Sequence, residues 1–154
     1  MTPSDLQQLL ITRAPRIPGI ADADRRSDDS PYGLTVTLDS GGQVWWTITG
    51  AGGAAPTQAV SGNAGEETQL PDLTGRPVAV ALVEQALVAA ATAGDASSDV
   101  VRVDRYSTRP DPPAVRYGAT LECRDGWKLF LSCYGTVHPG AAHPEQPYQP
   151  LSHI

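Results

Sequence analysis

Apolar and polar residues alternate in the first third of the chain in the way expected of a half-buried β-hairpin. Leu34, Val36 and Leu38 are separated by threonines, which predicts a strand with one buried face. Turn residues at 40–42 then lead into a second predicted strand at 43–49.

The same alternation predicts a second hairpin near the C-terminus. Its strands are expected at 115–124 and 127–136, joined by Asp125-Gly126, because both turn residues tolerate positive φ. A separate strand is expected at 100–106.

Capping residues predict a first helix at the N-terminus. Thr2 can cap it, with Pro3 at its first position and Asp5 in its first turn. Three leucines then fall on one face, and the helix should end before Pro15.

A second helix, apolar on nearly every side and therefore buried, is expected to open at Pro77 and to stop at Gly94. The charged segment 21–31 is expected to be flexible. The segment 50–75 is rich in turn residues and predicts a loop, with a short strand at 58–61.

The two hairpin sequences resemble each other. Residues 32–50 align with 117–135 without a gap at a constant offset of 85 (117 − 32), and five of the 19 aligned positions are identical. Two unrelated hairpins also share turn glycines and apolar strands, so this alternative stays open.

The favoured fold is one α+β domain over 1–136, in which two similar helix-plus-hairpin units form a mainly antiparallel sheet. An irregular Pro-rich tail at 137–154 follows.

A turn centred on Asp125-Gly126 fixes which side chains share a face. It places one set on a buried face: Tyr117, Ala119, Leu121, Cys123, Phe130 and Tyr134. The same register buries Trp45 in the first hairpin. It leaves a second, partly apolar face that needs cover from a helix, the other repeat, the tail or another protein. This face carries Val44, Trp46, Trp127, Leu129 and Leu131.

Composition narrows the possible partners. Lys128 is the only lysine beside ten arginines, which indicates a high-GC source such as an actinobacterium or one of its phages. The net charge of −6 disfavours binding to nucleic acid. Neither a signal peptide nor a membrane-spanning segment is predicted, so we expect a cytoplasmic protein, or a virion protein if a phage encodes it.

Two motifs raise chemical possibilities that the sequence does not support well. Residues 50–55 fit a loose dinucleotide-binding pattern, but Pro56 and the polar residues after it do not supply the helix that would hold a pyrophosphate. Cys123 and Cys133 are predicted on opposite faces of the hairpin, too far apart for a disulfide, and are expected to be reduced thiols.

Metal and catalytic sites are not expected either. The tail holds all three histidines beside Glu145, but a tail of this kind does not by itself hold metal ligands rigidly. Four aspartates lie at 22–29, but their spacing lacks the glycine and the distal glutamate of a calcium-binding loop. No nucleophile is placed beside a histidine and an acid. We therefore expect no cofactor and no enzyme, although acid–base chemistry by paired carboxylates stays open.

The leading functional hypothesis is a non-enzymatic structural or assembly protein, such as a small virion component of an actinobacterial phage or phage-like particle. It would form an oligomer or bind a protein partner through Val44, Trp46, Trp127, Leu129, Leu131, His138 and Tyr148. The alternative is a cytoplasmic protein-binding module, such as an immunity protein or a secretion-type chaperone. Its acidity would suit a basic partner.

Overall fold

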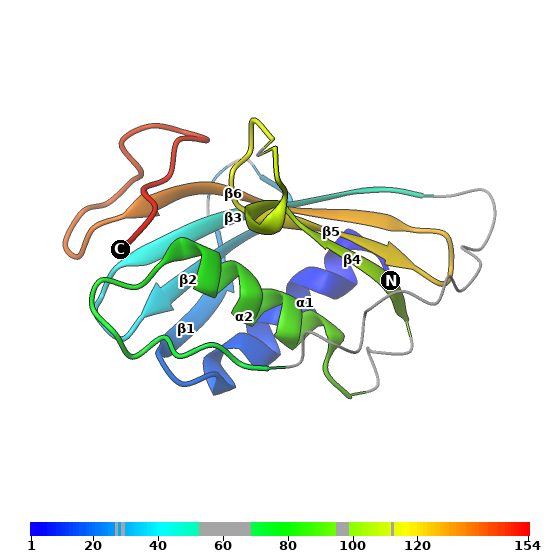
Figure 1. The fold of residues 1–154 in the computed structure, drawn as a ribbon, viewed down its shortest axis with the longest axis horizontal. Helices are drawn as coiled ribbons and strands as arrows, with labels where there is room; N and C mark the ends of the chain where they lie inside the picture. The colour runs from blue at the N-terminus through cyan, green and yellow to red at the C-terminus, as the bar shows by residue number, and fades with distance from the viewer. Residues whose placement is uncertain (27, 29, 53–68, 95–98, 112) are drawn as a thin grey trace.

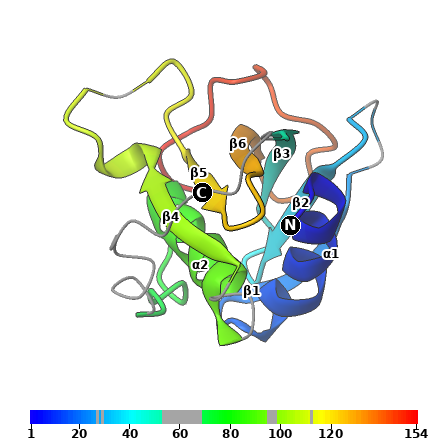
Figure 2. The ribbon, with the colours of Figure 1, turned by 90° about the vertical axis from the view of Figure 1, so that its right-hand side faces the viewer.

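The computed structural model describes residues 1–26, 28, 30–52, 69–94, 99–111 and 113–154. Within them, two α-helices lie on one face of a six-stranded sheet, and the C-terminal tail lies on the opposite side, which we call the outer face (Figures 1 and 2). The strand order is β1-β2-β3-β6-β5-β4, and all neighbours are antiparallel. The elements are α1 (Pro3–Arg13), β1 (Ile20–Arg25), β2 (Gly33–Leu38), β3 (Gln43–Ala51), α2 (Val80–Thr92), β4 (Val100–Arg105), β5 (Gly118–Cys123) and β6 (Lys128–Val137), with short 3-10 helices η1 (Ala14–Arg16) and η3 (Tyr106–Thr108).

The first helix begins as its capping residues predict. The Asp5 N–H donates to Thr2 Oγ1 (3.3 Å), and the Thr2 N–H donates to Asp5 Oδ2 (2.8 Å). This reciprocal pair satisfies two backbone donors at the helix start. Leu6 and Leu10 point into the core from the same helix.

The second helix begins at Val80, three residues later than predicted from Pro77. The residues before it are extended because they pair with the end of the chain. The Val78 N–H donates to the Ile154 carbonyl (2.7 Å), and the Ile154 N–H donates back (2.8 Å). The predicted stop is confirmed, since Gly94 has a φ of +60° just past the helix.

The charged segment 21–31 was expected to be flexible, and this expectation is wrong for its first part. Strand β1 runs from Ile20 to Arg25. Ile20 and Ala23 are buried, so pairing with β2 outweighs the low strand propensity of alanine and aspartate. The strand predicted at 58–61, most of the predicted loop at 50–75 and part of the glycine motif at 50–55 lie outside the described residues.

The register of the second hairpin differs by one residue from the prediction. The Cys123 N–H donates to the Trp127 carbonyl (2.8 Å), and Gly126 has a φ of +91°, so three residues form the loop. Leu121 consequently lies opposite Leu129 rather than Phe130. A shift of one residue moves every side chain of a strand to the other face.

The first hairpin has the same three-residue loop, with Gly41 at a φ of +88° and Val36 opposite Val44. The predicted faces are therefore reversed on β3 and β6. Trp46 is fully buried between the sheet and the helices, whereas Trp45 lies half-buried on the outer face.

The two halves of the sheet correspond closely in position. Strands β2 and β5 begin 85 residues apart, at Gly33 and Gly118 (118 − 33), and β3 and β6 begin at the same offset (128 − 43). Both edge strands also carry a register irregularity near their start, between Ile20 and Asp22 in β1 and between Val100 and Arg102 in β4.

Among the described residues, no helix is both long enough and apolar enough to span a membrane.

Candidate functional site

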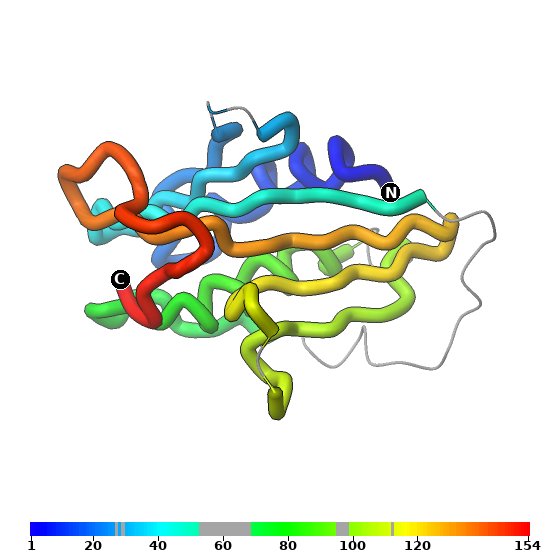
Figure 3. Tube along the Cα trace, turned by 90° about the horizontal axis from the view of Figure 1, so that it is seen from above, coloured from blue at the N-terminus to red at the C-terminus, as the bar shows by residue number. Residues whose placement is uncertain are grey.

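The C-terminal tail crosses β3 and β6 on the outer face (Figure 3). Five side chains gather there and contact one another. We call them the outer-face cluster: Arg26, Trp45, Tyr134, His143 and Tyr148. They come from four separate parts of the chain, namely the residue that follows β1, the central strands β3 and β6, and the tail. These residues are far apart in the sequence, so they meet only in the folded chain.

A β-bulge directs Tyr134 onto this face. Trp45 lies opposite Gly135 and Trp46 lies opposite Cys133, so Tyr134 is an extra residue of β6 without a cross-strand partner. Bulges of this kind bend a strand and re-aim a side chain, and they are common beside functional sites.

The aromatic rings of the cluster contact one another. Trp45 stacks on Tyr134 with 6.3 Å between ring centroids, and His143 meets the Trp45 ring edge-on at 5.8 Å. Tyr148 meets Tyr134 edge-on at 5.2 Å. Contacts of these geometries stabilise by about 0.5–1.5 kcal/mol per pair beyond the area they bury.

Arg26 supplies the cation of the cluster and is itself held rigidly. Its guanidinium carbon lies 4.4 Å from the Tyr134 ring centroid. Its nitrogens donate to the Trp46 carbonyl (3.3 Å) and to Thr47 Oγ1 (3.4 Å), and Nε forms an ion pair with Asp28 Oδ1 (2.8 Å). Burial raises the pKa of Asp28, but the Arg26 guanidinium and hydrogen bonds from backbone N–H groups such as that of Ser30 together outweigh this effect and hold the pKa below its usual value.

The tail is fastened over this face by close packing and by backbone hydrogen bonds. A Cβ on Gly135 would lie 2.6 Å from Pro144 Cβ, so glycine is required where the tail crosses β6. The Tyr148 N–H donates to the Tyr134 carbonyl (2.7 Å), and the Leu151 N–H donates to Thr136 Oγ1 (3.0 Å).

Tyr148, like His143, is an exposed member of the cluster. Its side chain is 49% exposed, and its φ is +59°, a conformation that residues other than glycine seldom adopt. An exposed aromatic ring is thus held on a strained backbone by a hydrogen bond to the sheet. Strained positions of this kind concentrate at functional sites.

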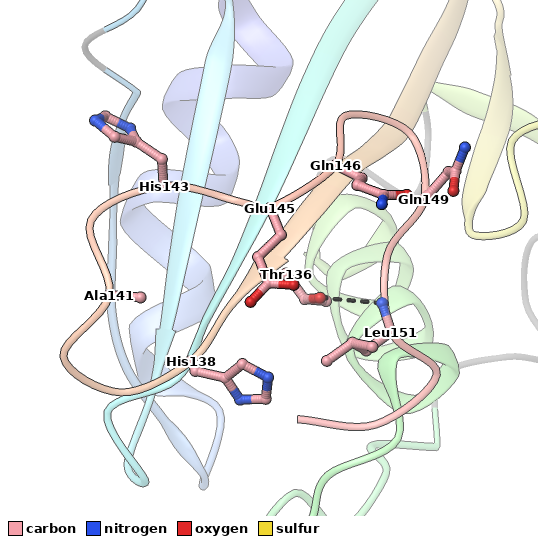
Figure 4. A pocket seen from close by; sticks show the side chains of 8 residues that line it. All are labelled: Thr136, His138, Ala141, His143, Glu145, Gln146, Gln149 and Leu151. Atoms are coloured by element: carbon pink, nitrogen blue, oxygen red, sulfur yellow. Dashed lines mark hydrogen bonds between the residues drawn. The ribbon is translucent and has the colours of Figure 1, made fainter.

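A polar pocket of about 220 Å³ lies between the tail and the end of β6 (Figure 4). His138 and Glu145 line it beside Thr136, whereas the ring of His143 points away from its centre. Within the described part of the chain, no three His, Cys, Asp or Glu side chains come close enough together to hold a metal ion. Asp29, one of the four aspartates considered for calcium, lies outside the described residues.

A second polar network lies between α2 and β5. Glu84 is fully buried and accepts hydrogen bonds from Arg105 Nε (3.0 Å), Ser107 Oγ (2.5 Å) and the Gly118 N–H (2.6 Å). Its oxygens are already occupied by donors from three elements. The carboxylate therefore ties α2 to β4, η3 and β5.

The seven residues predicted to form the interface do not share one surface in the structure. Four of them are fully buried in the core on the helix side of the sheet: Val44, Trp46, Leu129 and Leu131. The apolar outer face predicted from them is wrong, because the one-residue change of register turns these side chains inward.

The other three predicted interface residues lie nearer the surface. Trp127 is half-buried at the end of the sheet, where a Cβ on Gly50 would lie 3.2 Å from its ring. His138 and Tyr148 are exposed in the tail. Of these three, Tyr148 belongs to the outer-face cluster.

The other four cluster residues were missed by sequence reasoning. Trp45 and Tyr134 were assigned to the buried face because the turn was read as two residues long. The signal that could have corrected this was the glycine in each turn, Gly41 and Gly126, since a three-residue hairpin loop places a glycine at its positive-φ position.

Cys123 and Cys133 are both buried free thiols. They lie on the same face of the sheet, contrary to the predicted opposite faces, because the register of β6 is shifted. Burial raises the pKa of Cys123 to about 11 and that of Cys133 to about 12. Both thiols are therefore protonated and poorly nucleophilic near neutral pH.

Comparison with known proteins gave no matching family model, no matching curated protein and no matching solved structure.

Proposed function

We propose that this protein is a non-enzymatic protein-binding module, of the kind represented by immunity proteins and secretion-type chaperones, and that its partner binds at the outer-face cluster. The observation that supports this most directly is Tyr148, an exposed aromatic ring held in place from behind by Tyr134. Tyrosine, tryptophan and arginine are the residues that most often dominate binding energy at protein interfaces. The rigid backing lowers the entropy cost of ordering such a residue on binding.

We prefer a binding module to a structural or assembly protein. The assembly hypothesis required an exposed apolar face, and the residues predicted to form that face are mostly buried in the core. Among the described residues, the large apolar side chains that are well exposed are Leu70, Tyr148 and Leu151. Permanent assemblies bury larger and more apolar surfaces than these supply. A small aromatic and polar patch suits a partner that binds a folded monomer.

The proposal includes a duplicated architecture. Two related units, each a helix with its hairpin, would form the sheet, and the equal offsets of their strands and turns support this. Helices α1 and α2 are related by a different offset, so the units would differ in the length of their connections. The Pro-rich tail would then be an addition to the second unit, which completes the binding face by contributing His143 and Tyr148.

The partner is proposed to be a protein and not a nucleic acid, because a net charge of −6 repels phosphate backbones. The cytoplasm remains the proposed location. Buried thiols with raised pKa values fit a reducing compartment but do not require one.

The proposal can be tested by site-specific photo-crosslinking in a lysate of the source organism. A photoreactive phenylalanine analogue replaces Tyr148 in one sample and Gln8, an exposed residue of α1 on the helix side, in a matched control. We expect one protein to crosslink through position 148 and not through position 8. That protein should then bind the unmodified chain when both are purified. Crosslinking from position 8 alone, or no binding between the purified proteins, would contradict the proposal.

A further inference from the structure

The polar pocket between the C-terminal tail and the end of β6 has walls of fixed backbone. The Leu151 N–H donates to Thr136 Oγ1 (3.0 Å), which holds the tail against β6, and the Ala141 N–H donates to the His138 carbonyl (3.0 Å), which closes the turn at its edge. We call this cavity of about 220 Å³, lined among others by Thr136, His138, Glu145 and Leu151, the tail pocket. One water needs about 10–15 Å³, so the tail pocket is large enough for a side chain.

Three polar side chains point into the tail pocket (Figure 4). Glu145 comes from the tail, Thr136 from β6, and His138 directly follows β6. The side chains of Glu145 and His138 form no hydrogen bond or ion pair with any other described residue. Thr136 is only 9% exposed, and its hydroxyl accepts the Leu151 N–H but donates to no described residue. The tail pocket therefore has unused hydrogen-bonding capacity on three sides.

We infer that the tail pocket binds the guanidinium group of an arginine side chain of the protein partner. This inference rests on the proposed function and names the residue type by which the partner is recognised. The Glu145 carboxylate accepts two N–H groups of the guanidinium, and the Thr136 hydroxyl and a neutral imidazole at His138 each have a lone pair for another. The methylene groups of the arginine pack on Leu151, which is exposed at the wall of the pocket.

Arginine fits this arrangement better than other occupants do. A guanidinium carries five N–H donors in one plane, whereas an ammonium is a point charge with three donors, so acceptors spread around a pocket favour arginine over lysine. A carboxylate or phosphate group would lie against Glu145 and be repelled. A metal ion lacks ligands, because no three His, Cys, Asp or Glu side chains come together in the part of the chain that the structure describes.

The tail pocket lies next to the residue on which the proposed interface depends. Gln149 lines the tail pocket and, together with Tyr148, also lines a second cavity. The Tyr148 N–H is bonded to the Tyr134 carbonyl, so the ring and the pocket belong to the same fixed stretch of the tail. A partner that packs on the Tyr148 ring can therefore insert an arginine from the same segment. Tyrosine and arginine are among the residues that dominate interface energy.

The first test titrates the isotope-labelled full chain with Nα-acetyl-arginine amide and follows it by NMR. We expect a saturable shift of the Leu151 backbone amide, which is bonded to Thr136, with a dissociation constant of about 1–10 mM. Glu145→Gln should weaken binding at least about fivefold, because it removes the charge from the main acceptor. Nα-acetyl-lysine amide should also bind at least about fivefold more weakly.

Asp99→Asn is the matched control, since it too removes one exposed carboxylate. The Asp99 carbonyl accepts the Arg124 N–H beside the turn that joins β5 to β6, at the opposite end of the sheet from the tail (Figure 3). This variant should leave the dissociation constant unchanged.

The second test uses the partner identified by crosslinking at position 148. Glu145→Gln should weaken its binding at least about fivefold, whereas Asp99→Asn should not change it. The arginine probe at a saturating concentration should compete with the partner.

Four results would overturn the inference. They are the absence of a shift at Leu151, equal binding of the lysine probe, equal weakening by Asp99→Asn, which would indicate diffuse attraction only, and probe binding without competition, which would make the pocket a site for a free guanidinium compound. Failure here is distinguishable from failure of the proposed function. A partner that crosslinks at position 148 and binds the Glu145→Gln variant normally would remove the tail pocket from the interface and leave the binding module in place.

Discussion

Gln7 and Glu84 make corresponding connections in the two halves of the molecule. Gln7 Nε2 donates to the carbonyl of Gly33 (2.8 Å), and Glu84 Oε2 accepts from the N–H of Gly118 (2.6 Å). Each residue reaches from a helix to the first residue of the strand that opens a hairpin. In both halves a buried polar side chain thus fixes a helix against the sheet. This side chain is an amide in the first half and a carboxylate in the second.

Loss of Glu84 should be costly because its partners would remain buried without an acceptor. We expect Glu84→Ala to lower the free energy of unfolding by about 3–5 kcal/mol, the range for breaking a buried ion pair. Glu122→Ala, which removes a part-exposed carboxylate paired with Lys128, should cost no more than about 1 kcal/mol. Urea denaturation of both variants measures the difference, and similar losses would contradict the structural role given to Glu84.

The register of β3 predicts unequal roles for its two tryptophans. Trp46 is fully buried, so Trp46→Ala should cost about 3–5 kcal/mol. Trp45→Ala removes stacking and cation–π contacts on the outer face and should cost at most about 2 kcal/mol. A larger loss of unfolding free energy for Trp45→Ala than for Trp46→Ala, measured by urea denaturation, would contradict this register and support a two-residue turn.

The sequence predicts where the elements lie better than which way their side chains face. Alternation located the hairpin strands, and Thr2 with Asp5 located the first helix, because these signals are local. The face of β6 depends on whether the turn holds two or three residues, and one position is enough to reverse it. The outer-face cluster depends in addition on a bulge at Tyr134 and on a tail that returns to the sheet, and neither is encoded by neighbouring residues.

The capping box of the first helix predicts a specific loss of stability in acid. Hydrogen bonds from the Thr2 N–H and hydroxyl lower the pKa of Asp5. Because the folded-state pKa is lowered, the contribution is complete above the usual pKa of 3.8 and disappears as the pH falls through the lowered value. Asp5→Ala should therefore cost about 0.5–1 kcal/mol at pH 7 and progressively less as the pH falls below 3.8.

Ser4→Ala is the control for this measurement, since Ser4 is an exposed neighbour without a capping role. A difference between Asp5→Ala and the parent chain that stays constant from pH 7 to pH 2 would argue against the capping box.

The two cysteines should be unreactive in the folded protein. With pKa values raised to about 11 and 12, Cys123 and Cys133 hold almost no thiolate at pH 8. We expect native alkylation to be about 100-fold or more slower than that of an exposed cysteine, whereas the protein unfolded without reductant should take up two labels. Rapid native labelling would contradict the burial, and the absence of both labels after unfolding would indicate a disulfide.

The central claim is that a protein partner binds at the outer-face cluster, and the affinity of the purified partner for two matched variants tests it most directly. Tyr148→Ala and Leu70→Ala each remove a side chain that is about half exposed, at 49% and 51%, but Leu70 lies beside α2 on the helix side. We predict that Tyr148→Ala weakens binding by about 30-fold, which corresponds to about 2 kcal/mol, and that Leu70→Ala changes it by less than about twofold. Unchanged affinity for Tyr148→Ala, with weakened binding of Leu70→Ala, would place the interface on the helix side and contradict the account.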